Sequence, residues 1–235
     1  MDTTPSVIDL SMAITEDMRV YPGMAVPSVH QLKRHEIQGI QVSKLEIIVH
    51  AGTHVDAPRH VLADGQTIDR LDLDQLTGEA VLIDLSSLAP GSVIEQRHLV
   101  EYDSHIHRGD IVVLYTGYQR CPDVEKYCYL AVEGARWLAE DKGVKCLAGD
   151  IPSVDPINKQ ANVSSTTHPS HHILLNAGVP IVECLANLDQ LPPGRFFFCC
   201  FPLNIVGSEG APARAVAMNC LSRLNVPAGM EGSSS

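Results

Sequence analysis

The most constraining feature of this chain is the stretch from His50 to His60, which reads HAGTHVDAPRH. Its ionisable side chains, His50, His54, Asp56, Arg59 and His60, include three histidines and one aspartate at even spacings. Weak helix formers and a proline make a helix the poorer interpretation. In an extended chain the side chains alternate between two faces, so His50, His54 and Asp56 would share one face. The stretch therefore predicts a strand that ends near Asp56, a bend at the following proline, and His60 close by at the rim.

Two imidazoles and a carboxylate that converge on one point suit Zn, Mn or Fe. A lone pair of histidines four residues apart would be weak evidence, but the added aspartate and third histidine favour a metal site. One alternative is a polar edge strand whose histidines are satisfied by hydrogen bonds. Another is a non-haem iron oxygenase, whose triad of two histidines and one carboxylate would explain His50, His54 and Asp56 alone.

A second candidate residue lies in a predicted short helix at 167–178. Pro169 suits its first position and Gly178 its end. His171 shares a face with the leucines at 174 and 175, so we expect it to point towards the core, whereas His172 lies about a quarter-turn away. The first turn of a helix also disfavours imidazolium, and a neutral imidazole is the form that binds metal. These features make His171 a candidate ligand.

The segment 179–185 predicts a strand in which Val179, Ile181 and Glu183 share one face. A carboxylate is costly to bury unless it is paired or coordinates a metal, so the pattern itself draws attention to Glu183.

The remaining chain predicts strands interspersed with few helices, which indicates a mixed α/β or α+β fold. Strands are expected at 7–10, 45–50, 80–85, 111–115, 145–149, 195–206 and 214–218. The apolar face of 131–142 predicts the longest helix, with Gly143 at its end. Asp150 and Asp155 follow a strand end and are secondary site candidates, with loop capping as the alternative. Tyr21, in a turn, is a candidate pocket residue.

Composition excludes some classes of partner. The net charge is -11 and there is no run of lysine or arginine, which argues against nucleic acid and an anionic membrane. The seven cysteines are odd in number and lack CxxC spacing, and Cys199 and Cys200 lie in an apolar run typical of a core strand. With no apolar leader or long apolar span at hand, we expect a cytoplasmic protein.

The central stretch resembles HxGTHxDxPxH, the signature of the metal-dependent cyclase/hydrolase family, which includes bacterial kynurenine formamidases and isatin hydrolases. Supporting similarity lies at 8–11, 21–23, 149–155 and 171–183. The resemblance implies a swivelling β/β/α domain with a mixed sheet or barrel-like core and few helices. We expect one domain over 1–230 and a disordered tail at 231–235.

The resemblance also implies roles for the candidate residues. Family members are similar to His-x-x-Leu-Leu-x-x-Gly-x-x-x-x-Glu in the second segment, which aligns a ligand with His171 rather than the adjacent His172, although two neighbouring histidines keep that choice open. The implied metal ligands are His50, His54, Asp56, His171 and Glu183. One or two ions of Zn2+ or Mn2+ are expected, with Asp56 as a possible bridge. His60 is implied to be the general acid/base, with a ligand role as the alternative.

The implied reaction is hydrolysis of an amide or related carbonyl bond of a small molecule. Arylformamide hydrolysis, N-formylkynurenine to kynurenine and formate, ranks first, and ring-opening of a cyclic amide or lactone is the rival. Aromatic residues make up only 5% of the chain, which offers few stacking partners for an aryl substrate. A non-catalytic metal-binding module would give His60 no purpose, and an oxygenase would leave His171 and Glu183 without a role. The family further implies a homodimer or larger homo-oligomer.

Overall fold

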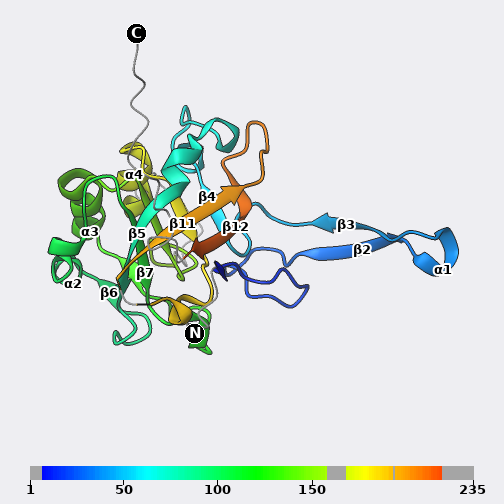
Figure 1. Ribbon diagram of the computed structural model, residues 1–235, viewed down its shortest axis with the longest axis horizontal. Helices are drawn as coiled ribbons and strands as arrows, with labels where there is room; N and C mark the ends of the chain where they lie inside the picture. The colour runs from blue at the N-terminus through cyan, green and yellow to red at the C-terminus, as the bar shows by residue number, and fades with distance from the viewer. Residues whose placement is uncertain (1–6, 158–167, 193, 219–235) are drawn as a thin grey trace, which may run out of the picture.

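A mixed eight-stranded sheet forms the centre of the chain (Figure 1). The computed structural model describes residues 7–157, 168–192 and 194–218. The strand order is β1-β12-β11-β5-β7-β9-β10-β4, and β4 pairs antiparallel with both β10 and β12, so the sheet closes into a barrel. The strands are β1 Val7–Asp9, β4 His54–Asp56, β5 Thr77–Asp84, β7 Ile111–Tyr115, β9 Cys146–Gly149, β10 Ile181–Glu183, β11 Arg195–Pro202 and β12 Gly210–Met218. The predicted mixed α/β fold with a barrel-like core and few helices is confirmed.

The central parallel strands β7 and β9 are buried on both faces, which explains why their sequences are apolar without alternation. In β7, Ile111 and Val113 belong to one apolar cluster with residues of β11 and β12. Val112 and Leu114 face the opposite cluster, which includes side chains from the helices. Both clusters therefore hold the barrel in shape, and they fix the positions of the strand ends.

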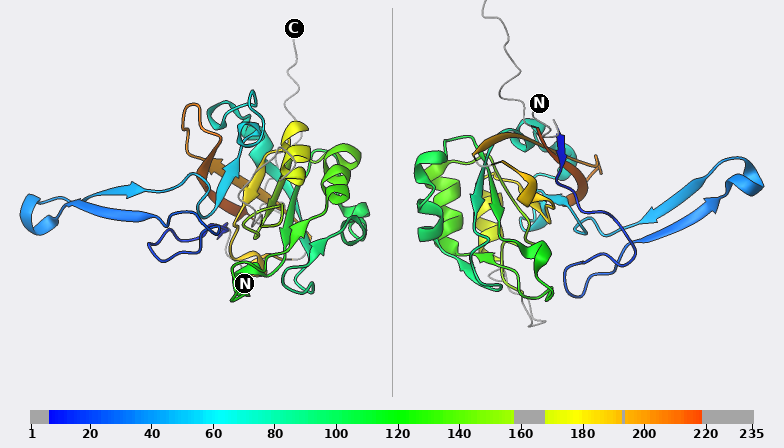
Figure 2. Two further views of the ribbon diagram at one scale, coloured as in Figure 1. Left: turned by 180° about the vertical axis from the view of Figure 1, so that it is seen from behind. Right: turned by 60° about the horizontal axis from the view of Figure 1, so that its bottom comes forward.

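Three helices cover the outer face of the parallel strands (Figures 1 and 2). They are α2 Gln96–Val100, α3 Val132–Arg136 and α4 Pro169–Asn176. The predicted helix at 131–142 is confirmed, although its second half, Trp137–Lys142, runs in wider π-helical turns before Gly143 ends it at φ 60°. The predicted helix with Pro169 in its first turn is confirmed as α4.

A long hairpin projects from the body, and we call residues 28–46 the arm (Figures 1 and 2). It consists of β2 Ser28–Lys33, the short helix α1 His35–Gln38 and β3 Val42–Glu46. The expected strand running from 45 through 50 into the histidine stretch is wrong, because β3 ends at Glu46. The chain then turns, and Gly52 at φ 68° redirects it into β4.

Shorter elements complete the described chain. β6 Val93–Ile94 pairs with β8 Tyr129–Leu130. The 3-10 turns are Pro58–His60, Ile68–Arg70, Leu73–Leu76, Asp103–His105, Tyr118–Arg120 and Leu188–Gln190. The last strand begins at Gly210 rather than at the expected Arg214, because its first residues pair with β4. The expected β11 strand stops at Pro202.

The predicted cysteine environment is confirmed for Cys199 and Cys200, which are buried and unpaired. None of the helices among the described residues is both long and apolar enough to cross a membrane. The expected tail at 231–235 lies outside the described residues.

Candidate metal centre

Strand β4 carries two of the predicted ligands into the interior. His54 and Asp56 flank Val55, so they share one face of the strand, and both are buried. The His54 Nδ1–H donates to the carbonyl of Gly52 over 2.8 Å, which leaves the lone pair of Nε2 facing Asp56. The turn at Gly52 that breaks the predicted strand therefore also orients His54.

Glu183 reaches the same point from the neighbouring strand. In the antiparallel register of β10 and β4, Glu183 lies directly opposite His54. The His54 Nε2 and Glu183 Oε2 atoms are 3.6 Å apart. The sequence pattern singled out Glu183 as a carboxylate that is paired or coordinates a metal. Its position supports this, because Glu183 is buried beside other ionisable groups and not among apolar side chains alone.

His171 enters from the first turn of α4. Its Nε2 lies 3.3 Å from Glu183 Oε1 and 3.6 Å from Asp56 Oδ2. Its Nδ1–H donates to Asp155 Oδ2 over 2.7 Å, and the same carboxylate accepts the backbone N–H groups of Ser170 and His171. Asp155 thus anchors the start of the helix and selects the His171 tautomer whose Nε2 faces the cluster.

His50 and His60 close the group on its open side. His50 lies in the turn before β4, and its Nδ1 is 2.7 Å from Asp56 Oδ1. His60 ends the 3-10 turn that starts at Pro58, and its ring centroid is 4.1 Å from that of His50. The predicted bend at Pro58 with His60 at the rim is therefore confirmed.

Unpartnered atoms at the centre of the group fit a divalent metal ion. Within the described chain, both Asp56 carboxylate oxygens and the Nε2 atoms of His50 and His54 are buried and make no hydrogen bond of acceptable angle, although His50 Nδ1 lies within 2.7 Å of Asp56 Oδ1. Leaving such groups unpaired is costly, so they call for a ligand. Two sets of potential ligand atoms each lie within 4.8 Å of one another, and both include Asp56: His50, Asp56 and His60, and His54, Asp56 and Glu183.

The family resemblance implies that His50, His54 and Asp56 hold one ion. Both histidines lie against the same oxygen of Asp56: His50 Nδ1 is 2.7 Å and His54 Nε2 is 3.3 Å from Asp56 Oδ1. They reach it from different segments, because the turn at Gly52 places His50 outside the strand that carries His54.

The charges in the cluster are coupled. Burial opposes a charge on His54, but the carboxylates of Asp56 and Glu183 outweigh it and raise the pKa of His54 to about 9. Burial likewise opposes a charge on His171, whereas Asp155, Asp56 and Glu183 raise its pKa. The helix dipole that was expected to keep His171 neutral is thus outweighed. Carboxylates that favour a proton at these nitrogens would also favour a divalent cation there.

His60 behaves differently from these histidines. Burial lowers its pKa to about 4, an effect only partly offset by Asp56. It is therefore neutral at pH 7 and can accept a proton there.

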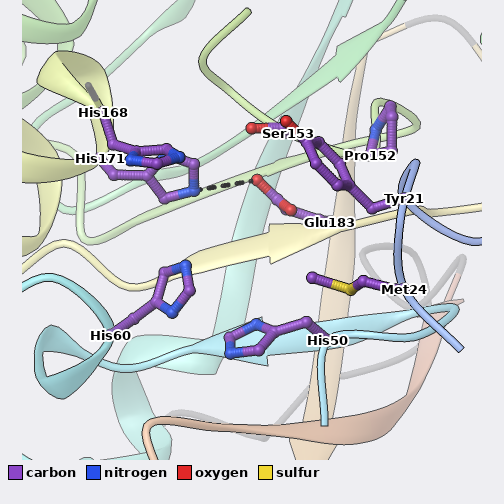
Figure 3. A pocket seen from close by; sticks show the side chains of 9 residues that line it. All are labelled: Tyr21, Met24, His50, His60, Pro152, Ser153, His168, His171 and Glu183. Carbon is purple, nitrogen blue, oxygen red and sulfur yellow. Dashed lines mark ion pairs between the residues drawn. The ribbon is translucent and has the colours of Figure 1, made fainter. Parts of the chain in front are cut away.

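A cavity of about 110 Å³ opens above the cluster (Figure 3). His168 and His171 stand on one side of it, and Tyr21 and Met24 on the other, with His50 and His60 below. The lining residues are Tyr21, Met24, His50, His60, Pro152, Ser153, His168, His171 and Glu183. Four residues of the candidate metal centre, His50, His60, His171 and Glu183, therefore form one wall of a pocket open to small molecules.

The structure separates the other sequence candidates. Tyr21 lines the pocket as expected. Asp150 lies outside the cluster. It accepts hydrogen bonds from Thr116 and Tyr118, so it caps a loop, which was the alternative to a role in the site. Neither His171 nor His172 belongs to the two sets, but His171 Nε2 contacts Asp56 and Glu183, whereas His172 makes no such contact within the described chain.

Sequence reasoning missed four pocket residues: Met24, Pro152, Ser153 and His168. Pro152 and Ser153 follow β9, whose carboxyl end drew attention only to the two aspartates. The position of Ser153 in the same loop was an available signal, whereas nothing local to Met24 marks it.

Exchanging Asp155 for asparagine is expected to weaken binding of a divalent metal by about 10- to 100-fold. An asparagine can direct an NH2 group at His171 Nδ1, which opposes the present tautomer. Competition with a chromophoric chelator measures the affinity. The matched control is Asp150→Asn, also a buried loop aspartate, which should bind metal like the wild type. Unchanged affinity in Asp155→Asn would refute the orienting role.

Comparisons with known proteins place the chain in a family. The family model described as "Putative cyclase" matches residues 8–156. A kynurenine formamidase of Salinibacter ruber is 34% identical over 216 residues, covering 90% of this chain and 96% of the relative. A solved structure described as a potential metal-dependent hydrolase with cyclase activity is 31% identical, with a TM-score of 0.74, covering 90% of this chain and 96% of that one. Isatin hydrolase A of Labrenzia aggregata, bound to benzyl benzoate, shares the fold at 23% identity, with a TM-score of 0.80 over 90% of this chain and 93% of that one.

Proposed function

The chain belongs to the Cyclase family, and from that premise we propose that it is a metal-dependent hydrolase of small-molecule amide bonds, with an arylformamide such as N-formylkynurenine as first candidate substrate. Relatives named kynurenine formamidase, 29–34% identical over most of their length, support the amide chemistry. The observation that carries the proposal is the fully buried Asp56, whose carboxylate faces His50 and His171, two histidines that line an open pocket.

The residues that would hold the metal are His50, His54, Asp56, His171 and Glu183. Because Asp56 belongs to both sets of ligand atoms, we propose two ions bridged by it. Imidazole and carboxylate donors without a thiolate suit Zn2+ or Mn2+. When bound, such an ion lowers the pKa of its water towards about 7 and polarises a carbonyl oxygen. Amide hydrolysis requires both a nucleophilic hydroxide and an activated carbonyl.

The chain's own residues would manage the proton and the substrate. His60 is neutral at pH 7 and borders the cavity, so it can take a proton from the attacking water and deliver it to the leaving nitrogen. Asp155 holds His171 in one tautomer throughout. The Ser153 side chain borders the same cavity and offers a hydroxyl to a polar group of the substrate.

An aromatic cluster beside the pocket supports an aryl substrate. Although the chain is poor in aromatic residues, Tyr21, Tyr118, Tyr127 and Tyr129 pack together. Tyr21 also lines the cavity, so one ring of this cluster is available for contact with an aryl group. The low aromatic content therefore does not argue against an arylformamide, because four of the chain's eleven aromatic residues form this cluster and one of them lines the cavity.

Metal content tests the proposal directly. We expect about two ions per chain in the wild type by inductively coupled plasma mass spectrometry, and fewer in both His50→Ala and Glu183→Ala, because both residues are proposed as ligands. His172→Ala, a histidine outside both ligand sets, is the control and should retain the metal. One ion lost only with His50→Ala would favour a mononuclear site without Glu183. A wild type that binds no metal when supplied with Zn2+ and Mn2+ would contradict the proposal.

The substrate is tested on the metal-loaded protein with N-formylkynurenine, isatin and a lactone. Highest kcat/KM on N-formylkynurenine supports the formamidase, and preference for isatin or the lactone would assign a ring-opening hydrolase instead. Full activity under anaerobic conditions would separate either enzyme from an iron oxygenase. Metal binding without turnover of any of the three would favour a non-catalytic module. The unpaired cysteines support the proposal of a cytoplasmic enzyme, since thiols stay reduced there.

A further inference from the structure

A second cavity adjoins the pocket above the metal centre, and we call it the side cavity. It shares Tyr21, His50 and Pro152 with the pocket. Tyr21 and Pro152 stand across the pocket from His168 and His171 (Figure 3). The side cavity holds about 10 Å³, room for about one water-sized group, so it can take a small end group of a substrate but not an aryl ring.

Arg19 places a permanent positive charge at the side cavity. It lines this cavity, and among the described residues no other lysine or arginine lines either the side cavity or the pocket. The chain as a whole carries a net charge of -11, so its field repels an anionic substrate. A guanidinium beside the pocket offsets that repulsion at the place where the substrate would bind.

The guanidinium of Arg19 has no carboxylate partner in the described chain. Three other arginines each pair with an aspartate at 2.6–2.7 Å: Arg120, Arg195 and Arg214. The two acidic residues that precede Arg19 do not take that role. Glu16 accepts the backbone N–H of Val29 over 3.1 Å, and Asp17 is exposed to solvent. Arg19 itself is half-buried, so its charge borders the side cavity without a neutralising partner.

Tyr118 holds the side chain of Arg19 in place. The guanidinium carbon lies 5.8 Å from the centre of the Tyr118 ring, and Arg19 Nη1–H donates to the Tyr118 carbonyl over 3.5 Å. Tyr118 is itself fixed, because its N–H donates to Asp150 Oδ2 and its hydroxyl to the carbonyl of Val124, each over 3.0 Å. A guanidinium has five N–H groups, so these contacts leave donors for a ligand.

The backbone around Arg19 is anchored on both sides. Met18 is buried, and its Cε lies so close to Gly52 that a Cβ at Gly52 would come within 2.8 Å of it. Tyr21 lines the pocket, and its carbonyl accepts the N–H of Met24. Arg19 therefore lies at a set position between the turn before β4 and the wall of the pocket.

We propose that Arg19 binds a carboxylate of the substrate, so that the preferred substrates are amides with a carboxylate on the part of the molecule away from the scissile bond. Arginine suits this role because its planar fork can donate two parallel hydrogen bonds to a carboxylate. The inference rests on the proposed function of the metal centre and narrows its substrate class. N-formylkynurenine carries such a carboxylate, whereas isatin carries none.

In this role Arg19 determines specificity and does not take part in the chemistry. No bond of the bound carboxylate changes during hydrolysis, so the contact is the same in the ground state and the transition state. Loss of such a contact raises KM and leaves kcat unchanged.

The test compares N-formylkynurenine with its methyl ester, which lacks the negative charge and keeps the formamide. Formate release is measured with the metal-loaded wild type and with Arg19→Gln. We expect Arg19→Gln to lower kcat/KM for the acid about 10- to 100-fold, through KM, and to leave kcat/KM for the ester within about twofold of the wild type. Arg19→Lys keeps the charge without the fork and should lie between the two.

The matched control is Arg136→Gln. It removes the same charge from α3, where Arg136 pairs with Glu140 at the surface. Exposed pairs of this kind contribute little, so kcat/KM for both substrates should stay at the wild-type level. Circular dichroism should show an intact fold in every variant.

Binding of kynurenine gives a second readout that needs no turnover. Kynurenine keeps the carboxylate and has no scissile amide. Its dissociation constant, measured by isothermal titration calorimetry, should rise about 10- to 100-fold in Arg19→Gln. If this rise is seen but the wild type hydrolyses neither formamide, the inference about Arg19 stands and the proposed function fails.

Any of three results would overturn the inference. An Arg19→Gln protein that matches the wild type in kynurenine binding and in kcat/KM for the acid would remove Arg19 from recognition, even with the hydrolase intact. An equal loss on acid and ester would make Arg19 a structural support of the pocket wall. Weaker inhibition by formate in Arg19→Gln, with an unchanged ratio of acid to ester, would assign the guanidinium to the released product instead of the substrate.

Discussion

Asp56→Asn is expected to lower kcat/KM by at least about 10³-fold, beyond the roughly 10- to 100-fold that loss of an outer-shell partner costs. Asp56 is the residue that the two sets of candidate ligand atoms share, and neither of its oxygens has a hydrogen-bond partner. Asparagine keeps the shape but removes the negative charge that balances the surrounding histidines. We therefore expect the metal content to fall together with the activity.

The control for this exchange is Asp189→Asn, which alters a carboxylate paired with Arg120 at the surface. Exposed pairs of this kind contribute little, so its activity and metal content should match the wild type. An Asp56→Asn protein that holds its full metal complement and retains a tenth of the activity would remove Asp56 from the centre of the mechanism.

His60→Gln is expected to lower kcat by about 10²- to 10⁴-fold while the metal content stays at the wild-type level. Glutamine fills similar space and forms hydrogen bonds, but it cannot exchange a proton near neutral pH. Burial lowers the pKa of His60 to about 4, so the wild-type side chain is available as a base at pH 7. Steady-state kinetics and elemental analysis on the same preparation measure both quantities.

The matched control is His172→Gln, a histidine of α4 outside both ligand sets, which should leave kcat and metal content unchanged. If His60→Gln instead loses one ion, His60 is a ligand in the set with His50 and Asp56, which the geometry also permits. If it keeps both its metal and full activity, His60 has neither role.

Much of the candidate site was predictable because its signals are local. The even spacing of His54 and Asp56 places them on one face of any strand, and the structure has them on β4. Pro58 ends that strand and leaves His60 at the rim, where the 3-10 turn now holds it. Glu183 was predicted as a ligand because an unpaired carboxylate is costly in a buried strand. His171 was predicted as a ligand because it shares a helix face with buried leucines.

Errors arose where one short segment could follow two paths. The alternating residues before His50 predicted a strand running into the motif, but β3 belongs to the arm and ends at Glu46. A local pattern reports that a segment is extended, not which strand it pairs with. The positive φ of Gly52 separates the two strands, so His50 lies in the turn before β4, with its ring centroid 4.1 Å from that of His60 and 5.1 Å from that of His54.

By itself, the sequence determined which residues could bind a metal, which segments are buried strands or helices, and that few helices cover a mixed sheet. Each of these follows from spacing and residue chemistry within about ten positions. Only the tertiary structure decided how the ligands are grouped, that Asp155 orients His171, and that the barrel closes through β4. Those relations join residues as far apart in the sequence as His54 and Pro212, which pair between β4 and β12. They depend on strand register and packing, which no single segment encodes alone.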